Sequence, residues 1–229
     1  MGRPLRVAPG ELIYHVLNRA NGRQRLFDDD GDYRAFERVM TQACSRVSMR
    51  LLAYCVMPNH WHLVVWPRQD GDLSRFMNWL TLTHTQRWHT HRQTVGTGHL
   101  YQGRFKFFVV QTDEHLLTVC RYVERNALRA GLVERAEAWR WSSLWRKTYG
   151  DATQQTLVSE WPVARPPDWV GWVNADEGGE ALRRLRQSVV RSQPFGELEW
   201  VTAMIERFGL VSTIRNEGRP RKVTMENCS

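Results

Sequence analysis

The chain has 229 residues, of which 42% are apolar and 24% are charged, and its formal net charge is +8 at pH 7. This length and composition predict a globular protein with one core of about 150 residues plus an extension, and they exclude a disordered or fibrous chain. No segment reaches about 18 uninterrupted apolar residues and the N-terminus has no hydrophobic signal core, so we expect a cytoplasmic protein without a membrane span.

The basic residues are almost all arginines. The planar guanidinium of arginine matches phosphate geometry and stacks on bases, so the positive charge favours a polyanionic partner such as nucleic acid. A high arginine content inherited from a GC-rich genome is the alternative, and composition alone does not separate the two.

The first part of the chain alternates between strand-like and helix-like segments. Residues 12–17 are strand-like and end in the turn-forming segment 18–22. Apolar residues at helical spacing predict an amphipathic helix from Tyr33 to about Val47. Residues 50–56 and 61–66 then indicate two strands, which a hairpin-type connection at 57–59 joins.

The segments that follow complete one known arrangement. A long helix is predicted at 72–91, a strand at 104–111, and a helix from Thr112 or Asp113 through Ala127. The order β-α-β-β-α-β-α predicts an α+β protein with a ferredoxin-like βαββαβα core, in which a four-stranded antiparallel sheet carries helices on one face. Residues 151–229, rich in Trp and Arg, are expected to form a mainly helical C-terminal extension with a basic tail.

Two pairs of residues suggest chemistry. His60 and His62 flank Trp61 in a predicted strand, so their side chains point to the same face. Tyr122 and Asn126 are four apart in a predicted helix and share one helical face. Two imidazoles and an amide oxygen suit Mg²⁺ or Mn²⁺ acting on a phosphate. Half-buried histidines satisfied by hydrogen bonds, a tyrosine that only packs and a polar residue near a helix end are the simpler alternatives.

The predicted chemistry is transfer of a DNA strand to tyrosine. A bound metal ion polarises the scissile phosphate, and the Tyr122 oxygen can displace a strand end and remain linked to the phosphate. Free tyrosine has a pKa of about 10, so the reaction needs the metal ion or neighbouring cations. By position, Arg104, Arg121 and Arg125 are the available cations.

Four segments carry a family resemblance. Residues 15–21, 54–65, 102–105 and 122–133 resemble, in this order, the single-tyrosine His-hydrophobic-His transposases of the IS200 type, and more closely the transposases associated with repetitive extragenic palindromes (REP). The resemblance implies a catalytic domain at residues 1–150 that cleaves single-stranded hairpin DNA through a 5′-phosphotyrosine link. It also implies that Tyr122 is the nucleophile and that His60, His62 and Asn126 bind the metal ion. Ala127 departs from the family pattern, in which proline is common after the asparagine.

Contacts with DNA are expected from arginines, lysine and the basic tail. The Gly218-Arg-Pro sequence resembles the core of a minor-groove hook. The basic helix near residue 183 is expected to contact hairpin phosphates, and the alternative is that its basic face is simply solvated. The predicted DNA-binding residues are Arg19, Arg23, Arg104, Lys106, Arg183, Arg184, Arg219 and Arg221.

The sequence therefore predicts a metal-dependent single-tyrosine DNA endonuclease and strand transferase. Its expected partner is single-stranded hairpin DNA, with no membrane, and it would act as a monomer or a homodimer. Two alternatives stay open: a non-catalytic DNA- or RNA-binding regulator on the same fold, and a metal hydrolase that uses a bound water while Tyr122 only packs.

Overall fold

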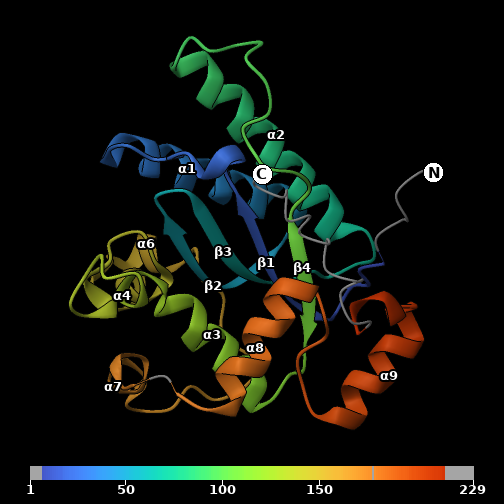
Figure 1. Cartoon of the computed structure of the whole chain (residues 1–229). Helices are drawn as coiled ribbons and strands as arrows, with labels where there is room; N and C mark the ends of the chain where they lie inside the picture. Colours follow the sequence, from blue (N-terminus) through green and yellow to red (C-terminus); the bar gives the residue numbers. More distant parts are fainter. Residues whose placement is uncertain (1–6, 177, 215–229) are drawn as a thin grey trace, which may run out of the picture.

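A four-stranded antiparallel sheet forms the centre of the computed structural model, which describes residues 7–176 and 178–214 (Figure 1). Its strands are β1 (Ile13–Arg19), β2 (Arg50–Met57), β3 (His60–Trp66) and β4 (Lys106–Val110), in the order β2-β3-β1-β4. All three neighbouring pairs are antiparallel. The predicted order of elements and the ferredoxin-like fold class are confirmed.

Helices α1 (Asp30–Val47) and α2 (Asp72–His91) cover one face of this sheet. The side chain of Asp29 caps α1 by accepting a hydrogen bond from the Asp32 amide. Both helices bury apolar stripes against one set of alternating strand residues, and Phe36, Trp61 and Phe76 are fully buried there.

Helix α3 (Glu114–Glu124) lies on the opposite face (Figure 1). The expectation of helices on one face therefore holds for α1 and α2 but does not extend to α3. The strands β1, β2 and β4 also carry apolar residues on this second face, among them Ile13, Cys55 and Phe108, and α3 buries them. A sheet that is apolar on both faces needs a covering layer on each.

The helix that was expected to continue through Ala127 is divided in two. α3 ends at Glu124, and the short α4 (Asn126–Arg129) follows after Arg125. The turn between them is still hydrogen-bonded, because the Arg125 amide donates to the Arg121 carbonyl over 2.9 Å. Asn126 therefore still follows Tyr122 by about one helical turn.

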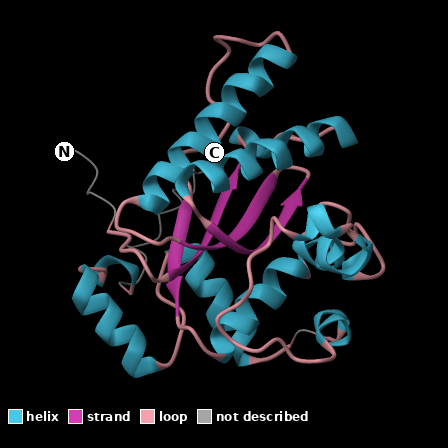
Figure 2. Cartoon of the chain, turned by 180° about the vertical axis from the view of Figure 1, so that it is seen from behind, coloured by secondary structure: helices cyan, strands magenta, loops and turns pink. Residues whose placement is uncertain are grey.

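The remaining elements are helical and surround the sheet (Figure 2). They include α5 (Ser143–Tyr149), α6 (Ala152–Gln155), α7 (Trp169–Asn174), α8 (Glu180–Arg191) and α9 (Leu198–Phe208), with the 3₁₀ turns Asn21–Arg23, Ala136–Ala138 and Val211–Thr213. Within the described residues 151–176 and 178–214, the mainly helical character of the extension is confirmed.

The extension is tied directly to the core. The Phe195 amide donates to the Val109 carbonyl over 2.9 Å, and the Trp161 indole donates to the Leu52 carbonyl over 2.8 Å. The proposed boundary at residue 150 stays a prediction. Within the described part of the chain, none of the helices has the length and apolar character that crossing a membrane requires.

Candidate active site

His60 and His62 point from β3 toward the face that α3 covers. Their ring centroids lie 5.1 Å apart, and the intervening Trp61 points to the opposite face, where it is fully buried. The alternation expected for a strand is therefore present, and the two imidazoles share one face.

Each of these imidazoles has one nitrogen held by a neighbour. His60 Nδ1 lies 2.6 Å from Asn59 Oδ1, and His62 Nδ1 lies 2.9 Å from Nε2 of His15 on β1. This arrangement leaves Nε2 of each ring as the nitrogen that can coordinate a metal ion. Hydrogen bonds of this kind from the second nitrogen orient metal-binding histidines in proteins.

Tyr122 on α3 lies beside His62 and His15. Its ring centroid is 6.0 Å from that of His62 and 6.3 Å from that of His15, and 9% of the residue is exposed. One chain thus brings the tyrosine and the histidines together without a second subunit. The distance is short enough for a phosphate to contact the phenol and the imidazoles at the same time.

Asn126, the third predicted ligand, follows Tyr122 by about one helical turn and is 8% exposed. Its Oδ1 accepts a hydrogen bond from the Arg129 guanidinium over 3.3 Å, and its buried Nδ2 has no hydrogen-bond partner among the described residues. An amide oxygen has two lone pairs, so Oδ1 can accept this hydrogen bond and still bind a cation. Two imidazole nitrogens and one amide oxygen are a donor set that fits Mn²⁺ or Mg²⁺.

Burial keeps the imidazoles neutral. It lowers the pKa of His60 to about 4, with a smaller effect from Arg19, and it lowers the pKa of His15 to about 3. Burial, followed by the neighbouring His15 and His60, holds the pKa of His62 well below its usual value. Neutral imidazole is the form that binds a metal ion, so these groups stay ready to bind at neutral pH.

The cation beside Tyr122 is not one of those expected. Arg121 and Arg125 donate hydrogen bonds to the backbone carbonyls of Ala175 and Val173, respectively, and Arg104 is exposed just before β4. Instead, the Arg129 guanidinium carbon lies 4.1 Å from the centroid of the Tyr122 ring. The spacing of seven residues, two helical turns, was the sequence signal that could have identified it.

The predicted DNA-binding residues are divided among several surfaces. Arg19 pairs with His60 across the sheet, so it is the one nearest to the candidate site, and Arg23 is exposed in the following 3₁₀ turn. Lys106 contacts the Val190 carbonyl of α8 over 3.3 Å. On α8, Arg183 pairs with Glu180 and Arg184 donates to the Gly196 carbonyl. Arg219 and Arg221 lie outside the described residues.

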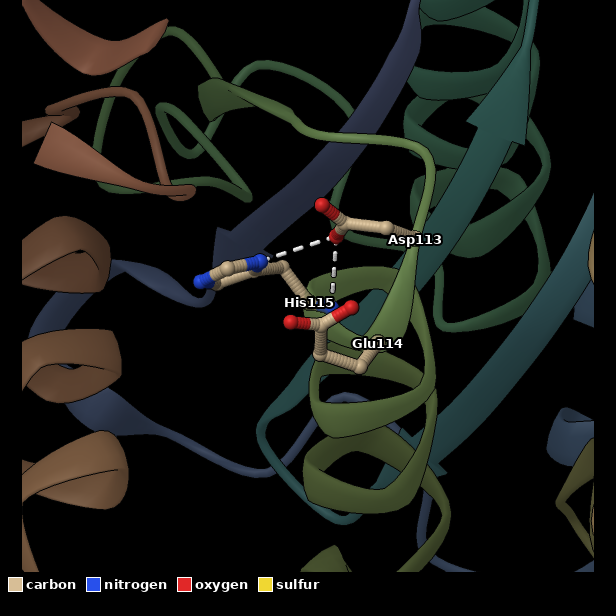
Figure 3. Close-up of side chains that lie close together, drawn as sticks. All are labelled: Asp113, Glu114 and His115. Carbon is tan, nitrogen blue, oxygen red and sulfur yellow. Dashed lines mark hydrogen bonds and ion pairs between the residues drawn. The ribbon is translucent and has the colours of Figure 1, made fainter. Parts of the chain in front are cut away.

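A second cluster with metal-binding atoms lies at the N-terminus of α3 (Figure 3). Asp113, Glu114 and His115 bring a ligand atom each to within 4.8 Å of one another. However, Asp113 accepts hydrogen bonds from both the backbone amide and Nδ1 of His115, each over 2.8 Å, which is a helix-capping arrangement. The cluster is about two helical turns from Tyr122, so it is separate from the predicted site.

Comparison with known proteins assigns the family. The family model described as "Transposase IS200 like" matches residues 10–126. The chain belongs to this family. It is therefore a transposase, a DNA-cleaving and DNA-joining enzyme, as the sequence predicted.

Individual proteins are also similar to this chain. A putative REP-associated tyrosine transposase of Haemophilus influenzae is 24% identical over 134 residues, which are 55% of this chain and 74% of that protein. A solved REP-associated tyrosine transposase bound to a REP hairpin is 19% identical, covers 64% of this chain and 84% of its own, and has a TM-score of 0.51. A putative transposase from Deinococcus radiodurans R1 is 18% identical, with coverage of 54% and 95% and a TM-score of 0.38. The match at a TM-score of 0.51 supports the fold.

Proposed function

We propose that this transposase cleaves single-stranded DNA beside a hairpin by attack of Tyr122 on a phosphate, and that His60, His62 and Asn126 hold a Mg²⁺ or Mn²⁺ ion at the reaction centre. The observation that carries the proposal is the 6.0 Å separation between the rings of Tyr122 and His62 within one chain. A bound divalent ion would polarise the phosphate and stabilise the charge of the transition state.

The proposed cleavage step exchanges one phosphate ester for another. Tyr122 Oη forms a bond to the phosphorus while the bond from phosphorus to the 3′ oxygen of the preceding nucleotide breaks. The phenol proton leaves through solvent, and the departing 3′ oxygen gains a proton to become a free hydroxyl. The product is a 5′-phosphotyrosine, and attack by a 3′-hydroxyl on it reverses the step and joins strands without a nucleotide triphosphate.

Arg129 supports this role of Tyr122. Its guanidinium lies against the phenol ring and also donates to the Tyr122 carbonyl over 3.0 Å, so its position over the ring is constrained. A cation at this distance stabilises negative charge that develops on the phenol and on the phosphate.

The hairpin substrate is inferred from charge and from the relatives. The net charge of +8 and the cations Arg19, Arg23 and Lys106 near the ends of β1 and β4 suit a nucleic-acid backbone. The solved relative is bound to a REP hairpin. Since one chain contains both the tyrosine and the histidines, we propose that a monomer is sufficient for cleavage. A cytoplasmic location stays a prediction.

The deciding experiment uses single-stranded hairpin oligonucleotides, labelled on the side 3′ of the expected cut, with Mn²⁺. We expect the wild-type chain to form a covalent protein–DNA adduct that resists denaturant, and Tyr122→Phe to form none and to leave the DNA intact. Tyr149→Phe, at a tyrosine that is 60% exposed, is the matched control and should retain full activity.

The two alternatives give different results in the same assay. A regulator without catalytic activity would bind the hairpin but form no adduct with any divalent ion. A metal hydrolase would cut the DNA without an adduct, and Tyr122→Phe would still cut. Either result would overturn the proposed function.

A further inference from the structure

His15 lies beside His62 in the histidine cluster, although its sequence position suggests only a strand residue. It is fully buried, and its ring lies between that of Phe108, at 4.8 Å, and that of His62, at 5.1 Å. Its Nε2 lies 2.9 Å from His62 Nδ1. The only ring nitrogen of His62 that remains for a ligand is therefore Nε2.

The proton positions in this pair decide whether His62 can bind a metal ion. A coordinating Nε2 must carry no proton, so the proton of neutral His62 must lie on Nδ1. That proton can be donated to His15 only if His15 Nε2 is an acceptor. The proton of His15 must then lie on its own Nδ1.

This arrangement leaves one nitrogen of His15 unpaired within the described part of the chain, and packing alone does not explain why a histidine occupies the position. His15 Nδ1 is buried and has no hydrogen-bond partner among the described residues, whichever form the ring takes. A buried polar group that has lost its water and gained no partner destabilises the folded state. A phenylalanine would fill the same space between Phe108 and His62 without this cost, so the imidazole of His15 calls for another reason.

We propose that His15 is a positioning residue for the metal site. Its Nε2 accepts the hydrogen bond from His62 Nδ1–H, and it thereby keeps His62 Nε2 unprotonated and turned toward the metal ion. This inference rests on the proposed function, because it assumes that His60 and His62 hold the ion.

His84 shows what a histidine without this role looks like in the same protein. It is 5% exposed on the other side of the sheet, and its Nδ1 lies 2.6 Å from the Tyr101 hydroxyl, which also accepts from the Trp61 indole over 3.1 Å. This network contains no candidate metal ligand. In contrast, Nε2 of His15 lies against His62, which is a candidate metal ligand.

The test measures Mn²⁺ affinity of the full chain without DNA, by the electron paramagnetic resonance signal of free Mn²⁺ during a titration. His15→Phe keeps an aromatic ring but removes the acceptor, and we expect it to bind Mn²⁺ about 10- to 100-fold more weakly than the wild type. His15→Gln places an amide oxygen near the position of Nε2 and should restore affinity to within a few-fold. Thermal unfolding of each variant shows whether the fold is retained.

A second measurement uses the wild-type chain and so does not depend on a variant that folds. With ¹⁵N-labelled histidine and saturating Mg²⁺, we expect the resonances of His62 to show a proton on Nδ1 and those of His15 to show a bare Nε2. A proton on His15 Nε2 would overturn the inference, as would wild-type Mn²⁺ affinity in His15→Phe or a His15→Gln variant no better than His15→Phe.

Failure of the inference differs from failure of the proposed function. If the wild type binds Mn²⁺, His62→Ala does not, and His15→Phe binds as the wild type does, only the role of His15 is overturned. If His62→Ala binds as tightly as the wild type, the metal site itself is wrong and both proposals fall.

Discussion

The two faces of the sheet each bury histidine, but they use it differently. On the face covered by α1 and α2, His84 is hydrogen-bonded to Tyr101, which is in turn bonded to Trp61, and aromatic rings surround the three. On the face covered by α3, the described residues hold one nitrogen each of His60 and His62. Tyr122 lies beside His62, and Arg129 lies against the Tyr122 ring.

This difference originates within three consecutive residues of β3. The pleat of the strand directs Trp61 to the α1 and α2 face and directs His60 and His62 to the α3 face. The tryptophan anchors the strand in the core, and the anchored strand presents two histidines at a fixed separation. A rigid strand is a more accurate support for a metal site than a loop.

The largest effect is expected from removing the anchor. Trp61→Ala should lower the free energy of unfolding by about 3–5 kcal/mol, because it leaves a cavity among Phe36, Tyr101 and their neighbours. Urea unfolding followed by circular dichroism measures this loss. Trp145→Ala, at a half-buried tryptophan, is the matched control and should cost less. Equal losses for the two variants would contradict the anchoring role of Trp61.

A change on the other face should affect activity more than stability. His62→Ala should slow Mn²⁺-dependent cleavage of a hairpin oligonucleotide about 10²- to 10³-fold, the usual loss when one electrostatic contributor to a transition state is removed. Single-turnover kinetics measure the rate.

The matched variant His84→Leu removes a histidine that is equally buried on the first face. It should cleave DNA within a few-fold of the wild-type rate at a temperature well below its unfolding. If His84→Leu and His62→Ala lost activity to the same extent, the two faces would not have the distinct roles described above.

The sequence was sufficient for those features that depend on local spacing. The order of elements, the common face of His60 and His62 and the position of Asn126 one turn after Tyr122 all follow from periods of about 2 and 3.6 residues. Local spacing did not predict which face of the sheet α3 covers, because a sheet with apolar residues on both faces can pack against this helix on either one.

Contacts across the fold were the other features that spacing alone did not reveal. His15 meets His62 because β1 and β3 pair in a register that places Leu17 opposite His62, and no local pattern specifies that register. Arg129 was missed because it lies beyond Ala127, where the expected helix ended, whereas the structure places it in α4. The proposed role of Tyr122 as nucleophile came from the resemblance to a family, because spacing alone left it as one possibility.

The free energy of unfolding should depend on pH because His84 is buried and neutral. Burial lowers its pKa to about 3 in the folded chain, whereas the unfolded chain takes up a proton near pH 6.5. Between these values the unfolded state binds more protons, so the free energy of unfolding falls as the pH falls. From pH 7 to pH 5 this single group should contribute a loss of about 2 kcal/mol.

Urea unfolding at pH 7 and pH 5 tests this contribution. The stability of the wild type should fall more than that of His84→Leu, and the difference between the two losses should be near the value for one buried histidine. Parallel losses in both proteins would mean that His84 is not the neutral, closed-in residue that distinguishes the first face.

The smallest effect is expected at Arg129. It should separate two functions of the α3 face, the rate of cleavage and the binding of the metal ion. Arg129→Met should slow cleavage about five- to thirtyfold, because it removes a cation worth about 1–2 kcal/mol beside the phenol ring. Its Mn²⁺ affinity should stay equal to that of the wild type or increase. In the wild type the Arg129 guanidinium lies 3.3 Å from Asn126 Oδ1 and repels a bound cation, and the variant lacks this charge. Arg129→Lys keeps the charge and should recover part of the rate. Cleavage by Arg129→Met at the wild-type rate would show that charge on Tyr122 is stabilised by other groups, whereas loss of Mn²⁺ binding would place Arg129 in the support of the metal site.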